Sequence, residues 1–471
     1  MEGTAPRGFA AFRKKFIGDR AFYAALVSLV LPLAIQQGIT SFVNLLDNVM
    51  VGALCTESIS GVAIVNQLVF VFNLTIFGAL SGASIFGAQY AGVGDHDGLR
   101  HTFRFKLIIG VLITALATTL FSVFGEELIA LYIHDTAAGA ASPELTMSEA
   151  KGYLSIALWG LFPFMLSQSF ASTLRETGET KAPMRASIVS ILVNFVLNYL
   201  LIYGKFGFPN MGVRGAALAT VIARFVEAAY LVAYTYENRA KHPFIAGALR
   251  SLRIPAALVK RILATGAPLL VNEFLWSAGT ALINQCYSYR GLQVVAATNI
   301  TSTVWQLFAV IMFAMGSAIS ILCGQKLGAG DIRGAREENT KLIFADVVLH
   351  VFVGLVIVAF SGWIPRIYNV GDDVRALTAS MIAISGATLW LHALTHAAYF
   401  TIRSGGRTLI TFLFDSGYTW AVALPLAYVL CYRTPLDIVL VYACLQACDL
   451  IKVALSMPLL VKGTWARNII S

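Results

Sequence analysis

The chain has 471 residues, of which 58% are hydrophobic and 13% charged, and its formal net charge is +9. Soluble domains carry about 25% charged and about 45–50% apolar residues, so this composition cannot cover a soluble globule of such length. It excludes a soluble enzyme and a nucleic-acid-binding module and predicts an integral membrane protein. In a membrane protein an excess of Lys and Arg is typical of basic cytoplasmic loops.

Long apolar stretches follow one another along the chain, and each supplies the about 20 residues that a helix needs to cross a bilayer. They are continuous, unlike the alternating segments of about ten residues in a membrane β-barrel. We predict twelve membrane-spanning helices, over residues 22–51, 59–90, 98–124, 149–173, 182–204, 212–236, 255–289, 293–326, 337–361, 376–402, 408–430 and 436–460.

Most of the 34 Lys and Arg residues fall in alternate segments between the predicted helices. Basic residues of membrane proteins accumulate on the cytoplasmic side. This distribution predicts an even number of spans and a multi-pass protein of the cell membrane with both termini in the cytoplasm.

The chain repeats itself. The pattern Gln-x-x-Gly-x-Gly-Asp-x-x-Gly-x-Arg begins at Gln89 and again at Gln325, and Arg-x-x-Gly-x-Thr begins at Arg175 and again at Arg403. We interpret both patterns as turns between helices. A parallel repeat of two six-helix lobes is typical of secondary transporters. The predicted segments are a cytoplasmic N-terminal segment 1–21, an N-lobe 22–236, a cytoplasmic linker 237–254, a C-lobe 255–460 and a cytoplasmic tail 461–471.

Five further segments carry a family resemblance in their order and spacing: 32–52, 174–184, 194–198, 215–220 and 424–428. Together they resemble the multidrug and toxic compound extrusion (MATE) family in its bacterial form, from about Phe22 to Trp465. The resemblance implies an all-α membrane fold of twelve helices in two lobes. It also implies export of bulky, often cationic compounds in exchange for inward H⁺ or Na⁺.

Polar side chains at similar depth in the N-lobe are the candidates for ion coupling, because an unpaired charge inside a bilayer costs at least about 2.5–3.5 kcal/mol. They are Asp47, Asn194, Asn198 and Thr220. The two Asn residues lie one turn apart on the same face of their helix. By resemblance, all four match the family's N-lobe coupling site. Some members of the family have an acid at the position of Asn198. The amide in this chain removes that negative charge, which disfavours Na⁺ binding and favours H⁺ as the coupling ion.

The C-lobe offers a second set of candidates. Glu273 follows Pro268 by five residues, as Gln37 follows Pro32, so one lobe has an acid where the other has an amide. Family members often carry an acid on this helix, which makes Glu273 a candidate for substrate or cation binding. Further candidates for this role are Gln37, Asp415 and Trp276, whose ring could stack on a cationic ligand.

For the other ionisable residues within the predicted helices, the sequence either favours a structural role or allows no assignment. Asp449 and Lys452 are three residues apart and could pair with each other. His392 and His396 are interpreted as helix-packing residues. We assign no role to Asp346 and His350.

The leading prediction is a secondary active antiporter that exports cationic or amphipathic small molecules by alternating access. The alternative is a flippase for lipid-linked oligosaccharides or cell-wall precursors. A membrane-embedded enzyme is less well supported, since the sequence lacks Gly-x-Ser-x-Gly and His-Glu-x-x-His. We expect small-molecule substrates in a lipid bilayer, no nucleic acid, no metal site, no cofactor besides the coupling ion, and a functional monomer.

Overall fold

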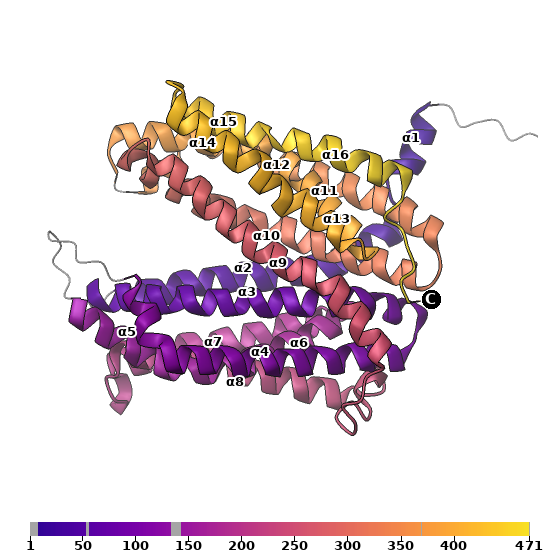
Figure 1. Cartoon of the computed structure of the whole chain (residues 1–471), viewed down its shortest axis with the longest axis horizontal. Helices are drawn as coiled ribbons and strands as arrows, with labels where there is room; N and C mark the ends of the chain where they lie inside the picture. The colour runs from indigo at the N-terminus through magenta and orange to yellow at the C-terminus, as the bar shows by residue number, and fades with distance from the viewer. Residues whose placement is uncertain (1–7, 53–55, 133–142, 369, 471) are drawn as a thin grey trace, which may run out of the picture. The chain divides into compact units, whose positions relative to one another are not determined.

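The computed structural model describes residues 8–52, 56–132, 143–368 and 370–470, and the regular structure within these residues is entirely helical (Figure 1). The helices, in chain order, are α1 (Gly8–Phe16), α2 (Arg20–Gly52), α3 (Thr56–Val93), α4 (His96–Ala130), α5 (Pro143–Ala157), η1 (Leu158–Gly160), α6 (Leu161–Glu176), α7 (Lys181–Tyr203), η2 (Lys205–Gly207), α8 (Gly212–Glu237), η3 (Pro243–Ile245), α9 (Ala256–Ser288), α10 (Leu292–Gly328), α11 (Ile332–Phe360), η4 (Ile364–Ile367), α12 (Asp372–Ser404), α13 (Thr408–Phe412), η5 (Leu413–Gly417), η6 (Thr419–Ala423), α14 (Leu424–Arg433), α15 (Ile438–Ala447) and α16 (Asp449–Lys462).

Within the described residues, eleven helical segments are long and apolar enough to cross a membrane. Each overlaps a predicted span, although the first runs over Phe12–Ser41 where the sequence predicts 22–51. The remaining predicted span corresponds to α9, which is continuous over 33 residues but carries Lys260, Arg261 and Glu273. The predicted span 408–430 contains two π-helical segments, η5 and η6.

The helix α1 lies in the predicted N-terminal segment 1–21. Its rings Phe12 and Phe16 pack on Phe344 of α11, with centroids 5.7 and 5.4 Å apart. The apolar contact therefore holds this short helix against the end of a long one.

The duplicated sequence pattern forms the same turn twice. Gly94 and Gly330 both adopt left-handed backbone conformations, with φ of 77° and 80°, which glycine reaches without steric cost. The following Asp95 and Asp331 cap the helices α4 and α11, each accepting a hydrogen bond from a backbone N–H of the first turn. The predicted turns between helices are thus present in both halves.

The chain forms two compact units. Unit 1 comprises Met1–Ala34, Ala88–Gly94 and Ala267–Ser471, and unit 2 comprises Ile35–Gly87 and Asp95–Gly266. Three long helices, α2, α3 and α9, contribute residues to both units. Each unit has its own apolar core: Phe72, Ile76 and Met165 lie in that of unit 2, and Ile319 and Trp465 in that of unit 1.

Candidate functional site

Three of the four predicted N-lobe residues lie together in unit 2. Asn198 donates through Nδ2 to Oδ1 of Asn194 on the same face of α7, at 3.1 Å. Asn194 donates through Nδ2 to the hydroxyl of Thr220 on α8, at 3.2 Å. Both Asn side chains are buried. The fourth residue, Asp47, belongs to α2 but lies outside the residues whose side chains the structure describes.

The polar face of α7 continues beyond these amides. Ser190 donates to the carbonyl oxygen of Ala223 at 2.8 Å, and Ser187 donates to Oε1 of Glu227 on α8 at 2.7 Å. Gln36 of α2 donates through Nε2 to the Ser187 hydroxyl at 2.8 Å. The sequence analysis overlooked Ser187 and Ser190, although their spacing to Asn194 places them on one helical face.

The structure places Gln37 at an exposed position of α2, next to Gln36, which makes the contact with α7. Successive residues of a helix point in different directions, so only one of two adjacent glutamines can reach a given neighbour. Gln37 and Glu273 therefore occupy equivalent positions in the two copies of the repeat, but their side chains have different neighbours.

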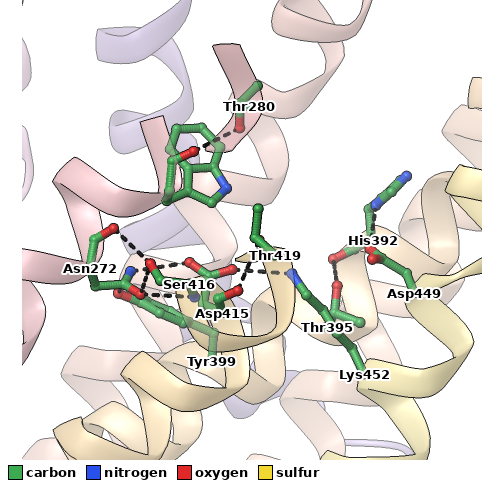
Figure 2. A network of polar contacts seen from close by, with 11 residues as sticks. Asn272, Thr280, His392, Thr395, Tyr399, Asp415, Ser416, Thr419, Asp449 and Lys452 are labelled. Carbon is green, nitrogen blue, oxygen red and sulfur yellow. Dashed lines mark hydrogen bonds and ion pairs between the residues drawn. The ribbon is translucent and has the colours of Figure 1, made fainter. Parts of the chain in front are cut away.

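A second polar cluster lies in unit 1, where Asn272 of α9 meets the π-helical segment η5 (Figure 2). Asn272 donates through Nδ2 to Oδ2 of Asp415 at 3.1 Å. Its Oδ1 accepts hydrogen bonds from the backbone N–H of Ser416 at 3.2 Å and from the Ser416 hydroxyl at 2.7 Å. One amide thus binds two neighbouring residues of the segment, Asp415 and Ser416. π-Helical turns inside longer helices occur frequently at functional sites.

The cluster continues to α16 and α12 (Figure 2). Lys452 donates to Oδ1 of Asp415 at 3.1 Å, and Nδ1 of His392 lies 2.9 Å from Oδ2 of Asp449. Asp449 and Lys452, which their spacing could pair, act on each other electrostatically, but each finds its hydrogen-bonding partner on another helical segment. His392, interpreted from the sequence as a helix-packing residue, joins α12 to α16 through this contact.

Glu273 and Trp276 lie beside this cluster on α9. Glu273 is half-buried, and the charged groups that act on it are Arg403 and Asp415. Trp276 is 37% exposed, and its carbonyl accepts a hydrogen bond from Thr280 at 3.0 Å. Three of the predicted C-lobe candidates, Glu273, Asp415 and Trp276, therefore occupy one region of unit 1.

Two further buried pairs fall outside these clusters. In unit 2, Lys106 of α4 donates to Oε1 of Glu176 on α6 at 2.5 Å, and both side chains are buried. Sequence reasoning missed this pair, although Glu176 follows the repeated Arg175. In unit 1, Nδ1 of His350 lies 2.9 Å from Oδ1 of Asp346, with both residues fully buried in α11.

Spanning helices in a duplicated arrangement, with buried polar clusters in each unit, define a membrane transporter. The MatE family model matches residues 32–200 and again 268–432, once in each half. The chain belongs to this family, and it is a transporter rather than an enzyme. The resemblance noted in the sequence is confirmed.

Relatives and solved structures extend this finding. The chain is 26% identical to a "Probable multidrug resistance protein NorM" of Thermotoga maritima over 452 residues, which covers 94% of this chain and 93% of the relative. It is 26% identical to a "Probable multidrug resistance protein YoeA" of Bacillus subtilis over 420 residues, which covers 87% of each.

Among solved structures, the fold resembles an outward-facing MATE family transporter, with a TM-score of 0.83, 18% identity, and coverage of 98% of this chain and 100% of the other. It also resembles a variant of the Vibrio cholerae MATE transporter VcmN, with a TM-score of 0.84, 16% identity, and coverage of 95% and 98%. The predicted fold class is confirmed.

Proposed function

We propose that the protein exports bulky cationic or amphipathic compounds across a bacterial cell membrane in exchange for inward H⁺. The observation that carries the proposal is the similarity, over most of both chains, to proteins named for multidrug resistance. The acids and aromatic side chains of unit 1 supply the chemistry for such substrates. A carboxylate at Glu273 would attract a cation, and the ring of Trp276 would stack on it.

The coupling site of the proposal comprises Asp47, Asn194, Asn198 and Thr220. The amides and the hydroxyl of this set already bond to one another. They would hold α7 and α8 in register around a single carboxylate. A carboxylate alone suffices to bind a proton, whereas Na⁺ in hydrocarbon requires several oxygen ligands and negative charge to offset its dehydration.

In this account the proton moves inward along its gradient and neutralises Asp47. A neutral Asp47 no longer requires polar groups around it. The α2 and α7 segments of unit 2 then change their packing, and the substrate is released outward. We further propose that the protein functions as a monomer, with both termini in the cytoplasm as the distribution of basic residues predicts.

Dye efflux by cells that lack their own exporters tests this proposal. Wild-type protein should lower the accumulation of a cationic dye, and Asp47→Asn should abolish this effect while the protein still inserts. The amide removes the proton-binding group and retains its shape. Asp97→Asn, which alters an exposed acid at the start of α4, is the matched control and should behave as wild type. Full efflux by the Asp47→Asn variant overturns the coupling role.

A further inference from the structure

The linker 237–254 is bound to the rest of unit 2 by the guanidinium group of Arg104 on α4. This group donates hydrogen bonds to three backbone carbonyl oxygens of the linker: from Nε to Ala248 at 2.8 Å, from Nη1 to Arg253 at 3.1 Å and from Nη2 to Gly247 at 2.9 Å. A single side chain thus fixes the backbone of the second half of the linker.

The first half of the linker is held one turn earlier on the same helix. Arg100 donates through Nε to the carbonyl oxygen of Phe244 at 3.2 Å. The Phe244 ring is fully buried, and its centroid lies 5.4 Å from that of Phe103 on α4. The linker therefore follows the first turns of α4 and does not extend away from the helix.

The sequence of α4 indicates how deep in the membrane the linker lies. Residues 107–125 carry no charged side chain, and at 1.5 Å per residue they span about 28 Å, close to the thickness of a hydrocarbon core. Arg104 precedes this apolar stretch by three residues, or about 5 Å along the helix. The part of the linker that Arg104 binds is therefore level with the lipid headgroups.

The face of α4 that binds the linker is apolar further along. Val111 and Leu112 lie two turns beyond Arg104 on the same helical face, and they are 45% and 59% exposed. Such side chains in a spanning helix are suited to contact with acyl chains. The linker therefore lies at the edge of an apolar surface of unit 2.

At this level the linker exposes apolar and basic side chains next to each other. Leu249 and Leu252 are 58% and 57% exposed, and each is followed by an exposed arginine, Arg250 and Arg253. Residues 238–272 include six basic residues and no acidic one. All six are exposed, and the ion pairs of the described part of the chain include none of them: Arg239, Lys241, Arg250, Arg253, Lys260 and Arg261. This combination is typical of segments that bind the surface of an anionic bilayer.

The tail after the C-lobe lacks this combination, although it is bound in a similar way. Arg336, the repeat partner of Arg100, donates through Nη2 to the carbonyl oxygen of Gly463 at 2.8 Å. The Trp465 ring of the tail is buried, and within the described residues 463–470 no large apolar side chain is exposed. The exposed leucines are therefore a property of the linker and not of any segment that follows a lobe.

We propose that the linker 237–254 is a binding surface for anionic phospholipids of the leaflet next to the start of α4, which is the cytoplasmic leaflet in the predicted orientation. Leu249 and Leu252 insert among the lipids, and Arg250 and Arg253 bind headgroup phosphates, to each of which a guanidinium group can donate two hydrogen bonds. Free phosphate would engage the arginines alone and leave both leucines in water. The inference goes beyond the proposed function, because it depends on neither the substrate nor the coupling ion.

The contacts of Arg104 prepare the linker for this role. Backbone carbonyl groups without a partner are costly where lipid replaces water, and Arg104 supplies a donor to three of them. The linker is also ordered before lipid binds, so that binding requires little further loss of conformational entropy.

Fluorescence quenching in lipid nanodiscs tests the inference on the full-length protein. Leu252→Cys is labelled with bimane, and wild type taken through the same labelling gives the background from the native cysteines. The nanodisc lipids have dibrominated acyl chains, which quench bimane on contact, and consist of phosphatidylcholine alone or with one third phosphatidylglycerol. We expect the chains to quench the label at least about twofold more strongly when phosphatidylglycerol is present.

Matched variants separate the linker from a general effect of charge. Bimane on Thr464→Cys, an exposed position of the tail, should be poorly quenched in both kinds of nanodisc. In labelled Leu252→Cys, Arg250→Gln with Arg253→Gln should abolish the effect of phosphatidylglycerol. Lys462→Gln with Arg467→Gln removes the same charge from exposed positions of the tail and should leave the effect intact.

Three results would overturn the inference. The first is equal quenching of the Leu252→Cys label with and without phosphatidylglycerol. The second is an equal loss of the effect in the two double variants, because net charge and not the linker would then attract the lipid. The third is loss of the effect when phosphate replaces chloride at constant ionic strength, which would identify a site for free phosphate.

Discussion

The backbone of Gly92 on α3 lies directly against that of Gln325 on α10. The reciprocal contact also exists, because Gly328 lies against the backbone of Gln89. A β-carbon on either glycine would collide with the opposite carbonyl group. The two copies of the repeated Gln-x-x-Gly pattern therefore pack on each other, which explains why glycine occupies the fourth position of both.

We predict that Gly92→Ala destabilises the protein by at least about 1–3 kcal/mol, the usual cost of overpacking, because backbone atoms cannot move aside as a flexible side chain can. Thermal unfolding in detergent should show a clearly lowered midpoint. Gly362→Ala is the matched control, since nothing lies within 4 Å of a β-carbon there. Equal midpoints for the two variants would contradict the close contact.

Removal of one partner of the buried pair Lys106 and Glu176 should be strongly destabilising. Lys106→Met leaves a buried carboxylate without its ammonium, and breaking such pairs costs about 3–5 kcal/mol. The double variant Lys106→Met with Glu176→Met should recover most of the loss, since no charge remains to be compensated. Additive losses in the double variant, measured by thermal unfolding, would show that the pair does not act as a unit.

Acidification should loosen the segment between α8 and α9. His242 is buried there against the rings of Tyr234 and Phe244, and burial lowers its pKa below the ordinary value of 6.5, with Glu179 opposing and Lys241 adding to the effect. The unfolded segment then binds more protons than the folded one. The stability of the segment is therefore fully present above about pH 6.5 and is lost as pH falls towards the lowered pKa.

Hydrogen–deuterium exchange over residues 238–254 at pH 7.5 and 5.5 measures this effect. His242→Phe, compared at the same pH, should exchange slowly under both conditions because the ring remains and the titratable group is gone. If residues 238–254 of the variant exchange as fast as those of wild type at pH 5.5, protonation of His242 does not cause the loosening of this segment.

Glu273→Gln should weaken the binding of cationic substrates at least tenfold and leave that of neutral substrates nearly unchanged. Gln is close in shape to Glu, so the change removes charge and little else. Binding of matched charged and neutral dyes to purified protein, followed by fluorescence, gives the two affinities. An equal loss for both would indicate a packing role for Glu273.

The sequence predicts what depends on local pattern and misses what depends on neighbours across helices. The length of the apolar stretches predicted the spanning helices, and the repeated glycines predicted the turns. Gly178 and Gly406, like Gly94 and Gly330, adopt a left-handed backbone conformation in both copies of the repeat. The spacing of Asn194 and Asn198 sufficed to place both amides on one face.

Spacing along the chain could not predict which side chains of other helices a residue contacts. Asp449 and Lys452 satisfy the rule for pairing along a helix, yet each binds a side chain from a different helix. Nothing along α4 marks Lys106 as the partner of Glu176. Asn272, 143 residues before Asp415 in the chain, donates a hydrogen bond to its carboxylate within the π-helical segment. Only the packed structure brings these groups together.

Efflux of a cationic dye by the purified protein in liposomes tests proton coupling most directly. Vesicles carry either a pH gradient in the absence of Na⁺ or a Na⁺ gradient at equal pH. Proton coupling predicts that the pH gradient alone drives dye movement, and that the Na⁺ gradient alone does not. If the Na⁺ gradient drives movement and the pH gradient fails, proton coupling is wrong, and Asn194, Asn198 and Thr220 become candidate ligands of the ion.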